Sequence, residues 1–164
     1  GKHHVLNAAA AVWRHFAEYG DWCTFEGSGP ASFREVGINL HVLEPGQPNC
    51  KYHGESAQED FLVLSGECIA VIDGEERRLR AWDFVHCPSW TEHVFVGAGD
   101  GPCLLLMVGA RPEEGGIIYP VSEAAARHGA SVAVATPDPQ EAYAGRPPRV
   151  EIPARRDVLP GAPR

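Results

Sequence analysis

Short apolar runs alternate with turn residues through the middle of the chain, from residue 33 to residue 110. The runs are Val36–Leu43, Phe61–Leu64, Cys68–Ile72, Phe84–Cys87, His93–Val96 and Cys103–Val108. Short strands at such spacing, with no helical segments between them, predict an antiparallel β-sandwich or β-barrel. The pair Asp73-Gly74 lies between two of these strands and predicts a two-residue hairpin of type I′. The pattern therefore predicts an all-β fold.

The N-terminal part has a different pattern. Residues Ala8–Tyr19 place Val12, Trp13 and Phe16 at helical spacing, and Asn7 and Gly20 are suitable caps, so a short amphipathic helix is expected. A loop rich in glycine and serine follows. We therefore divide the chain into an N-terminal helix and loop (1–32), a β-barrel (33–116) and a C-terminal part (117–164).

The C-terminal part loses the strand pattern. Ser122–His128 predicts two helical turns with Ser122 as the cap, and Pro139–Tyr143 predicts one further turn. From Arg146 onward the chain is dense in proline and arginine and poor in aromatic residues. We expect an extended arm there, which either wraps around a partner subunit or is mobile.

Composition narrows the class of protein. The 164 residues are 44% apolar, as in a globular protein of one domain. The formal charge of -8 argues against a nucleic-acid partner, and no apolar run is long enough to span a membrane. The five cysteines are odd in number and contain no Cys-x-x-Cys pair, which favours free thiols and a cytoplasmic location.

Four side chains form a candidate metal site. His53, Glu55 and Glu59 follow one another closely, and His93 lies in the next turn-rich segment. Residues two apart on a strand face the same side, so His53 and Glu55 would point inward together. Two imidazoles and two carboxylates suit one divalent metal ion, namely Zn, Fe, Mn or Ni. Spacing alone leaves open the alternative that these residues form an exposed polar loop.

The same residues carry a resemblance to a known family. The stretches from Gly46 to Gly66 and from Trp82 to Gly97 resemble the two signature motifs of the cupin superfamily. The matching positions are Pro45, Gly46, His53, Glu59, Gly66, Pro88, His93 and Gly97. The resemblance covers residues 33–110 and implies a small antiparallel β-barrel of the double-stranded β-helix or jelly-roll type, with a metal inside and pairing into homodimers.

This chain departs from the cupin pattern at three positions. Glu55 stands where the second histidine of the first motif is usual, which leaves either a two-His, two-Glu site or three ligands. Trp82 and Trp90 replace glycines of the second motif. We expect these tryptophans to serve packing rather than substrate stacking, since tryptophan is mainly a large apolar group.

A few other residues are alternatives for the site. Gln58 replaces Glu59 if the register shifts by one, and Cys50 and Cys87 flank the two motifs, although packing is the favoured role for both cysteines. His41 alternates with Ile38, Leu40 and Val42 and so faces the other side of its strand. His86 is a similar case.

Cupins include enzymes, sensors and storage proteins, so the fold alone does not fix the activity. The leading hypothesis is an enzyme of the oxygenase or isomerase type that acts on a small polar metabolite through a divalent metal in the barrel. The alternative is a non-catalytic cupin that binds a small molecule or a metal as a sensor. Both have a small-molecule ligand, and neither involves nucleic acid or a membrane.

Overall fold

The computed structural model describes residues 3–163, and almost all of its regular structure is antiparallel β-sheet. The larger sheet contains β1 (Trp13–His15), β2 (Asp21–Thr24), β3 (Val36–Leu43), β5 (Glu59–Ser65), β8 (Phe84–Cys87), β10 (Cys103–Ala110) and β12 (Val150–Ile152). Its strand order is β12-β1-β2-β3-β10-β5-β8. This arrangement confirms the predicted all-β class.

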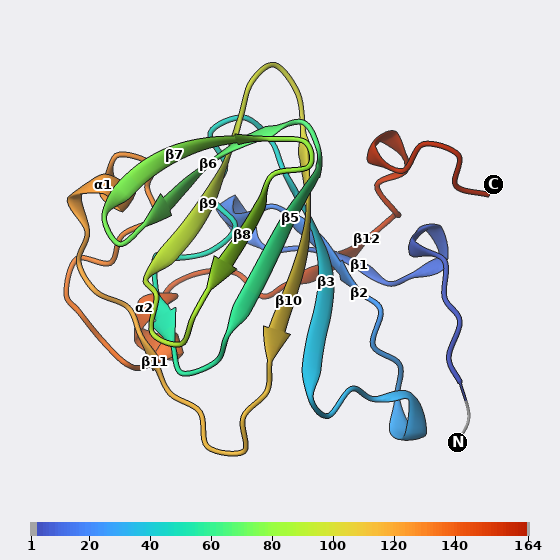
Figure 1. Cartoon of the computed structure of the whole chain (residues 1–164), viewed down its shortest axis with the longest axis horizontal. Helices are drawn as coiled ribbons and strands as arrows, with labels where there is room; N and C mark the ends of the chain where they lie inside the picture. Colours follow the sequence, from blue (N-terminus) through green and yellow to red (C-terminus); the bar gives the residue numbers. More distant parts are fainter. Residues whose placement is uncertain (1–2, 164) are drawn as a thin grey trace.

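Two smaller sheets complete the barrel. One consists of β7 (Glu75–Arg80), β6 (Glu67–Ile72) and β9 (His93–Ala98), and the other of β11 (Ile117–Ile118) and β4 (Gly54–Glu55). Figure 1 shows β6, β7 and β9 on one side of the barrel and β5 and β10 on the other. The predicted hairpin joins β6 to β7, and both Asp73 and Gly74 have the positive φ angles that a type I′ turn requires.

The barrel core lies between the two main sheets. Phe61 and Leu105 of the larger sheet pack against Ala70 and Phe95 of the three-stranded sheet, and all four are almost inaccessible to solvent. Because alternate residues of a strand face opposite sides, the same strands bury a second cluster outside the barrel. This second cluster contains Trp13, Cys23, Leu40, Val42, Leu104 and Val158.

The predicted N-terminal helix is wrong. Ala8–Ala10 and Ala17–Tyr19 form single 3₁₀ turns, and β1 lies between them. An isolated helix of this length has little stability of its own, whereas β1 pairs with β2 on one side and β12 on the other. Long-range pairing therefore overrides the local helical spacing.

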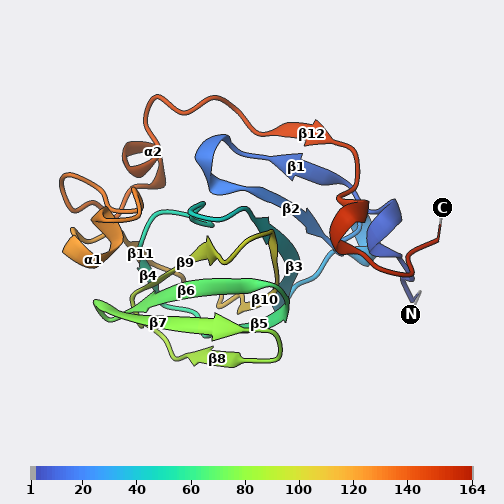
Figure 2. The same ribbon diagram turned by 90° about the horizontal axis from the view of Figure 1, so that it is seen from above.

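The alternative of a mobile C-terminal arm is wrong, because the arm packs on its own chain, while the alternative that it wraps around a partner subunit stays a prediction. Strand β12 pairs with β1, and Val158 is buried in the cluster around Trp13. Figure 2 shows β12, β1 and β2 side by side over one side of the barrel. The two predicted short helices are present as α1 (Glu123–Ala126), capped by Ser122, and α2 (Pro139–Ala142).

The division into residues 1–32, 33–116 and 117–164 stays a prediction, although strands from both outer parts join the larger sheet. Among residues 3–163, helices are short, and none has the length and apolar character needed to cross a membrane.

Candidate metal centre

Backbone pairing brings the two sequence motifs together. His53 and His93 face each other across an isolated antiparallel bridge, in which the His93 amide donates to the His53 carbonyl at 2.8 Å. Their rings point to the same side, with centroids 4.9 Å apart. Glu59 begins β5 and points toward both rings. The opposite residue on β10 is Gly109, which has no side chain to fill the space next to the Glu59 carboxylate.

Three of the four predicted ligands meet at one point. His53, Glu59 and His93 each offer a ligand atom within 4.8 Å of the other two. Oε2 of Glu59 lies 3.0 Å from Nε2 of His93 and 3.9 Å from Nε2 of His53. The structure does not include Glu55 in this group, although Glu55 lines the same cavity.

Hydrogen bonds to the main chain fix the tautomer of both imidazoles. Nδ1 of His53 lies 2.8 Å from the Lys51 carbonyl oxygen, and Nδ1 of His93 lies 3.0 Å from that of Thr91. A carbonyl oxygen only accepts, so each Nδ1 must carry a proton and donate it. In the neutral rings both Nε2 atoms then present a lone pair toward Glu59, as metal-binding histidines do.

Oε2 of Glu59 supports the same interpretation. It is buried, and no described residue forms a hydrogen bond with it. Two imidazole lone pairs and a carboxylate oxygen without a donor between them repel one another, and a cation relieves that repulsion. A divalent ion therefore fits the residues that are present.

The cluster also shifts the pKa values of its members. Burial and the charge of His93 lower the pKa of His53 to about 4. For His93, burial acts in the lowering direction but Glu59 outweighs it, so the pKa is raised. For Glu59, burial acts in the raising direction but the two histidines outweigh it and lower the pKa. Burial and the charge of Glu59 raise the pKa of Glu55 to about 7.

The cluster opens into a cavity of about 610 Å³. Asn39, His41, Asn49 and Cys50 line it from the barrel. The remaining wall comes from outside the barrel motifs: Phe16, Tyr19 and Trp22 on the N-terminal side, and Tyr119, Pro139, Tyr143 and Arg149 on the C-terminal side. Sequence reasoning missed this wall, because long-range strand pairing rather than a local motif positions its residues.

Of the alternative ligands, His41 and Cys50 line the cavity but lie outside the three-residue cluster. The Cys50 thiol is 3.6 Å from Nδ1 of His53, the ring nitrogen that donates to Lys51. Gln58 and His86 are exposed and both contact Asp60 instead. Cys87 packs in the barrel core.

The two motif tryptophans do not line the cavity. Trp82 is 74% exposed and Trp90 is 53% exposed. Trp82 therefore does not pack within its own chain, and packing against a neighbouring subunit stays a prediction. Trp90 covers Gly116, with a ring carbon 3.1 Å from the position that a Cβ would take there.

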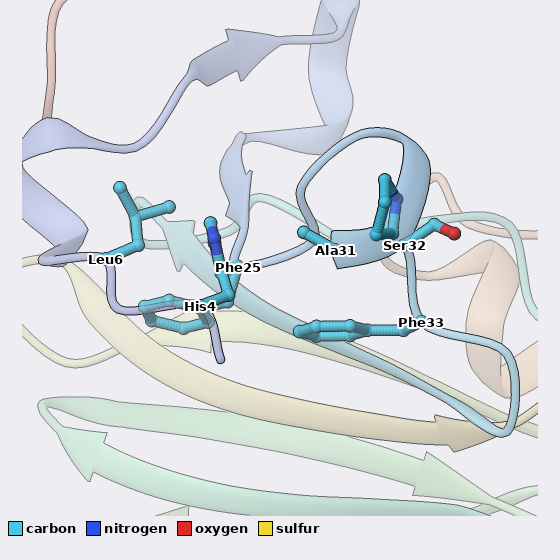
Figure 3. A pocket seen from close by; sticks show the side chains of 7 residues that line it. His4, Leu6, Phe25, Ala31, Ser32 and Phe33 are labelled. Atoms are coloured by element: carbon cyan, nitrogen blue, oxygen red, sulfur yellow. The ribbon is translucent and has the colours of Figure 1, made fainter. Parts of the chain in front are cut away.

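A second hollow, of about 390 Å³, lies near the N-terminal segment, and Figure 3 shows Leu6, Phe25 and Phe33 around it. His4 is the one titratable residue among those that line it, and the hollow shares no lining residue with the main cavity. The chemistry of the chain is concentrated at the main cavity.

The fold and the paired motifs define a small β-barrel protein with a candidate metal centre inside. Residues 39–109 match the family model of the cupin domain. The match covers less than half of the chain and agrees with the resemblance that the two sequence motifs carry.

Solved structures of low sequence identity share the fold. A sugar phosphate isomerase of the cupin superfamily from Silicibacter pomeroyi is 23% identical, with a TM-score of 0.61 over 69% of this chain and 79% of that one. A protein provisionally named a sugar phosphate isomerase, from Acidithiobacillus ferrooxidans, is 23% identical, with a TM-score of 0.53. That match covers 60% of this chain and 64% of the other, so this chain spans less than two thirds of the length of that protein.

A third structure, the polyketide cyclase RemF from Streptomyces resistomycificus, is 15% identical, with a TM-score of 0.51 over 59% of this chain and 69% of that one. The names of these proteins differ in chemistry, and at such identities the likeness establishes the shared fold.

Proposed function

We propose that this protein is a cupin enzyme that acts on a small polar metabolite through one divalent metal ion held by His53, Glu59 and His93. Glu55, two residues after His53 and on the wall of the same cavity, is the proposed fourth ligand. The proposed reaction is of the isomerase or oxygenase type. Such a metal supplies a Lewis acid or, as iron, a centre that activates O₂.

The observation that carries the proposal is the buried Oε2 of Glu59. Among residues 3–163 it has no hydrogen-bond partner, and two imidazole Nε2 atoms lie within 4 Å of it. While both histidines are neutral, no donor pairs with this carboxylate oxygen. A buried charge of that kind is costly, so a protein keeps one mainly where a ligand or a cation will pair with it.

Other groups of this chain would orient the metal ligands, bind the metabolite and exclude water. The backbone contacts at Nδ1 hold the two imidazoles in one orientation. Asn39 offers an amide group to a bound molecule, whereas the Asn49 Oδ1 atom already accepts from the Phe95 amide at 2.8 Å. The rings of Tyr119 and Tyr143 exclude water from one side of the cavity. The cavity is large enough for a metabolite of a few carbon atoms.

Metal analysis tests the proposal. The protein, purified without chelator or nickel resin, should contain close to one divalent ion per chain, measured by inductively coupled plasma mass spectrometry. Glu59→Gln keeps the size of the side chain but removes its charge, and should lose most of the bound metal. Glu113→Gln, at an exposed position, is the matched control. Glu55→Gln shows whether the fourth ligand contributes.

Activity is tested on the metal-loaded protein with a panel of small hydroxy acids, keto acids and sugar derivatives, by product analysis and O₂ uptake. Turnover that Glu59→Gln abolishes supports the enzyme. Tight binding of a panel member without turnover supports the alternative, a sensor cupin. Metal-free protein with the same melting temperature before and after chelator treatment contradicts both.

We further propose a homodimer in the cytoplasm. The five cysteines are free, which suits a reducing compartment. The exposed side chain of Phe84 begins β8, the edge strand of the larger sheet, and the exposed Trp82 lies two residues before it. Apolar groups at an unpaired edge favour association. Light scattering should give twice the chain mass at micromolar concentration, and a monomer that persists at all concentrations contradicts the dimer.

A further inference from the structure

One guanidinium lies at the cavity wall without an acidic partner. Arg149 directly precedes β12, and its Cζ lies 4.9 Å from the ring centroid of Phe16 and 5.9 Å from that of Trp22. No carboxylate among residues 3–163 forms an ion pair with it. By contrast, the other cavity arginine, Arg111, is held by Glu26 at 2.7 Å. The rings of Phe16 and Trp22 orient the Arg149 guanidinium, and its N–H groups stay available to a ligand.

His41 lies on the same wall as Arg149. It faces Trp22 across the β2–β3 ladder, with ring centroids 6.3 Å apart and planes 20° from parallel. Its Nδ1 is buried, and the described part of the chain provides no hydrogen-bond partner for it. Burial, together with the positive charge of Arg149, lowers the pKa of His41 to about 4, so the ring is neutral at physiological pH. A neutral imidazole with one unpaired nitrogen can donate a hydrogen bond to a ligand.

The charge balance of the cavity favours an anion. A divalent ion balanced by the Glu59 and Glu55 carboxylates leaves no net charge at the cluster, so Arg149 gives the cavity a net positive charge. Arg111 is neutralised by Glu26. Glu55 and Glu59 are the two carboxylates among the residues that line the cavity.

We propose that the cavity binds a small organic oxyanion, a carboxylate or a phosphate ester, whose charged group is received by Arg149 and His41 while its hydroxyl or carbonyl oxygens face the metal cluster. The metal half of this statement rests on the proposed function, and the Arg149–His41 subsite does not. Both residues adjoin Trp22, which lies outside residues 39–109, so the subsite depends on a part of the chain that the cupin match does not include.

Three probes with one carbon skeleton test the subsite: glycerol, glycerate and glycerol 3-phosphate. Titration calorimetry on the full-length, metal-loaded protein should show that at least one of the two anions binds on the order of tenfold more tightly than glycerol, because ionic hydrogen bonds are the strongest available. The anion that binds more tightly identifies carboxylate or phosphate as the preferred charged group. Equal, weak binding of all three overturns the proposal.

Two variants locate the anion. Arg149→Gln should weaken binding of the preferred anion on the order of tenfold and leave glycerol unchanged. His41→Phe keeps a ring beside Trp22 but removes both nitrogens, and should weaken the anion severalfold. Arg77→Gln, an exposed guanidinium on β7 that is 3.8 Å from Glu75, is the matched control and should bind as the parent does. Unchanged anion binding in Arg149→Gln overturns the proposal.

Bound metal is measured in every variant, so that failure of the subsite and failure of the metal centre are distinct results. Arg149→Gln that keeps its metal and loses the anion supports the subsite. Arg149→Gln that loses both, with an altered melting temperature, shows a structural role and contradicts it. If the parent protein holds no metal but binds the anion through Arg149, the proposed function fails and the subsite stands.

Discussion

Two tryptophans hold backbone angles that residues other than glycine rarely adopt. The φ angles of Trp82 and Trp90 are 76° and 68°. These are the two positions at which the cupin motif usually has glycine, so the resemblance located a conformational requirement that this chain meets with strained residues. Left-handed backbone costs an L-residue roughly 1–2 kcal/mol. Since Trp82 is 74% exposed, little burial offsets that cost.

Trp82→Gly is therefore expected to raise the free energy of unfolding by about 0.5 kcal/mol, since relief of strain exceeds the added flexibility of the unfolded chain. Phe84→Gly is the control, because Phe84 is also exposed but lies in the strand β8. That variant should lose about 1 kcal/mol. Urea unfolding measures both, and a loss of stability in Trp82→Gly equal to that in Phe84→Gly contradicts the interpretation.

His41 predicts a specific sensitivity to acid. Burial and the charge of Arg149 lower the pKa of His41 to about 4, whereas the unfolded chain has the ordinary value near 6.5. Below pH 6.5 the unfolded state thus binds the proton more readily, and stability falls as the pH drops from 6.5 toward 4. Because the ring is half-buried, we expect this residue to account for about 2 kcal/mol of the loss.

His41→Gln should remove the part of the acid-induced loss of stability that is due to His41. Comparison of the variant with the parent protein separates His41 from other groups that titrate in acid. Urea unfolding at pH 7.0 and pH 4.5 gives the change in free energy for each protein. The parent should lose about 2 kcal/mol more than the variant between these two pH values. Parallel losses would show that the His41 ring is protonated as easily in the folded state as in the unfolded one.

One arginine adds an ionic attachment between the C-terminal arm and the rest of the chain. Arg155 donates to Asp21 at 2.7 Å, to Glu44 at 2.8 Å and to Asp157, and its side chain is only 20% exposed. A guanidinium that joins three carboxylates holds the chain that follows β12 against β2 and the end of β3. Ion pairs in such a half-buried network contribute more than isolated surface pairs do.

Arg155→Ala should lower the free energy of unfolding by about 1 kcal/mol and speed hydrogen exchange at the amides of β12. Arg77→Ala, which removes a guanidinium that is 69% exposed, should change neither quantity measurably. Hydrogen exchange followed by mass spectrometry reports on β12 directly. Unchanged exchange there in Arg155→Ala would show that strand pairing alone holds the arm.

The strands that the sequence predicted best are mostly apolar segments bounded by turn residues or charged residues. Val36–Leu43 and Phe84–Cys87 match β3 and β8 residue for residue. Strand β7 was missed because Glu75–Arg80 is nearly all charged and lies exposed at a sheet edge. The hairpin at Asp73 was its one local signal. Strands β1 and β12 depend on each other, and no local pattern reveals a partner so far along the chain.

The candidate site was predictable to the extent that it follows from motif spacing. That spacing picked out His53, Glu59 and His93, and alternation along a strand correctly put Glu55 on the wall of the same cavity. Arg149 was not predictable, because its position depends on the pairing of β12 with β1. The motif residues follow from local spacing, whereas the wall residues depend on long-range strand pairing. The fold was therefore easier to predict than the groups that would contact a ligand.

Metal removal should destabilise the whole molecule, because the cluster ties β5 to the bridge between the two motifs. A bound ion at a hundredfold excess over its dissociation constant adds about 2.7 kcal/mol. For a chain of this length, chelator should therefore lower the melting temperature by roughly 5–10 °C, and added metal should restore it. Glu59→Gln should not respond to chelator. Equal shifts in the parent and in Glu59→Gln would place the effect elsewhere.

The pairing of β1 with β12 has a consequence for biosynthesis. A ribosome delivers β1 before the strands of the barrel, but its partner β12 emerges only after the entire barrel has been made. Until then the nascent chain carries an unpaired backbone edge on β1 and an uncovered Trp13, which are features that invite association with other chains. The wall that carries Arg149 thus forms after the barrel strands, and a ligand held there can stabilise the molecule only once β12 has been made.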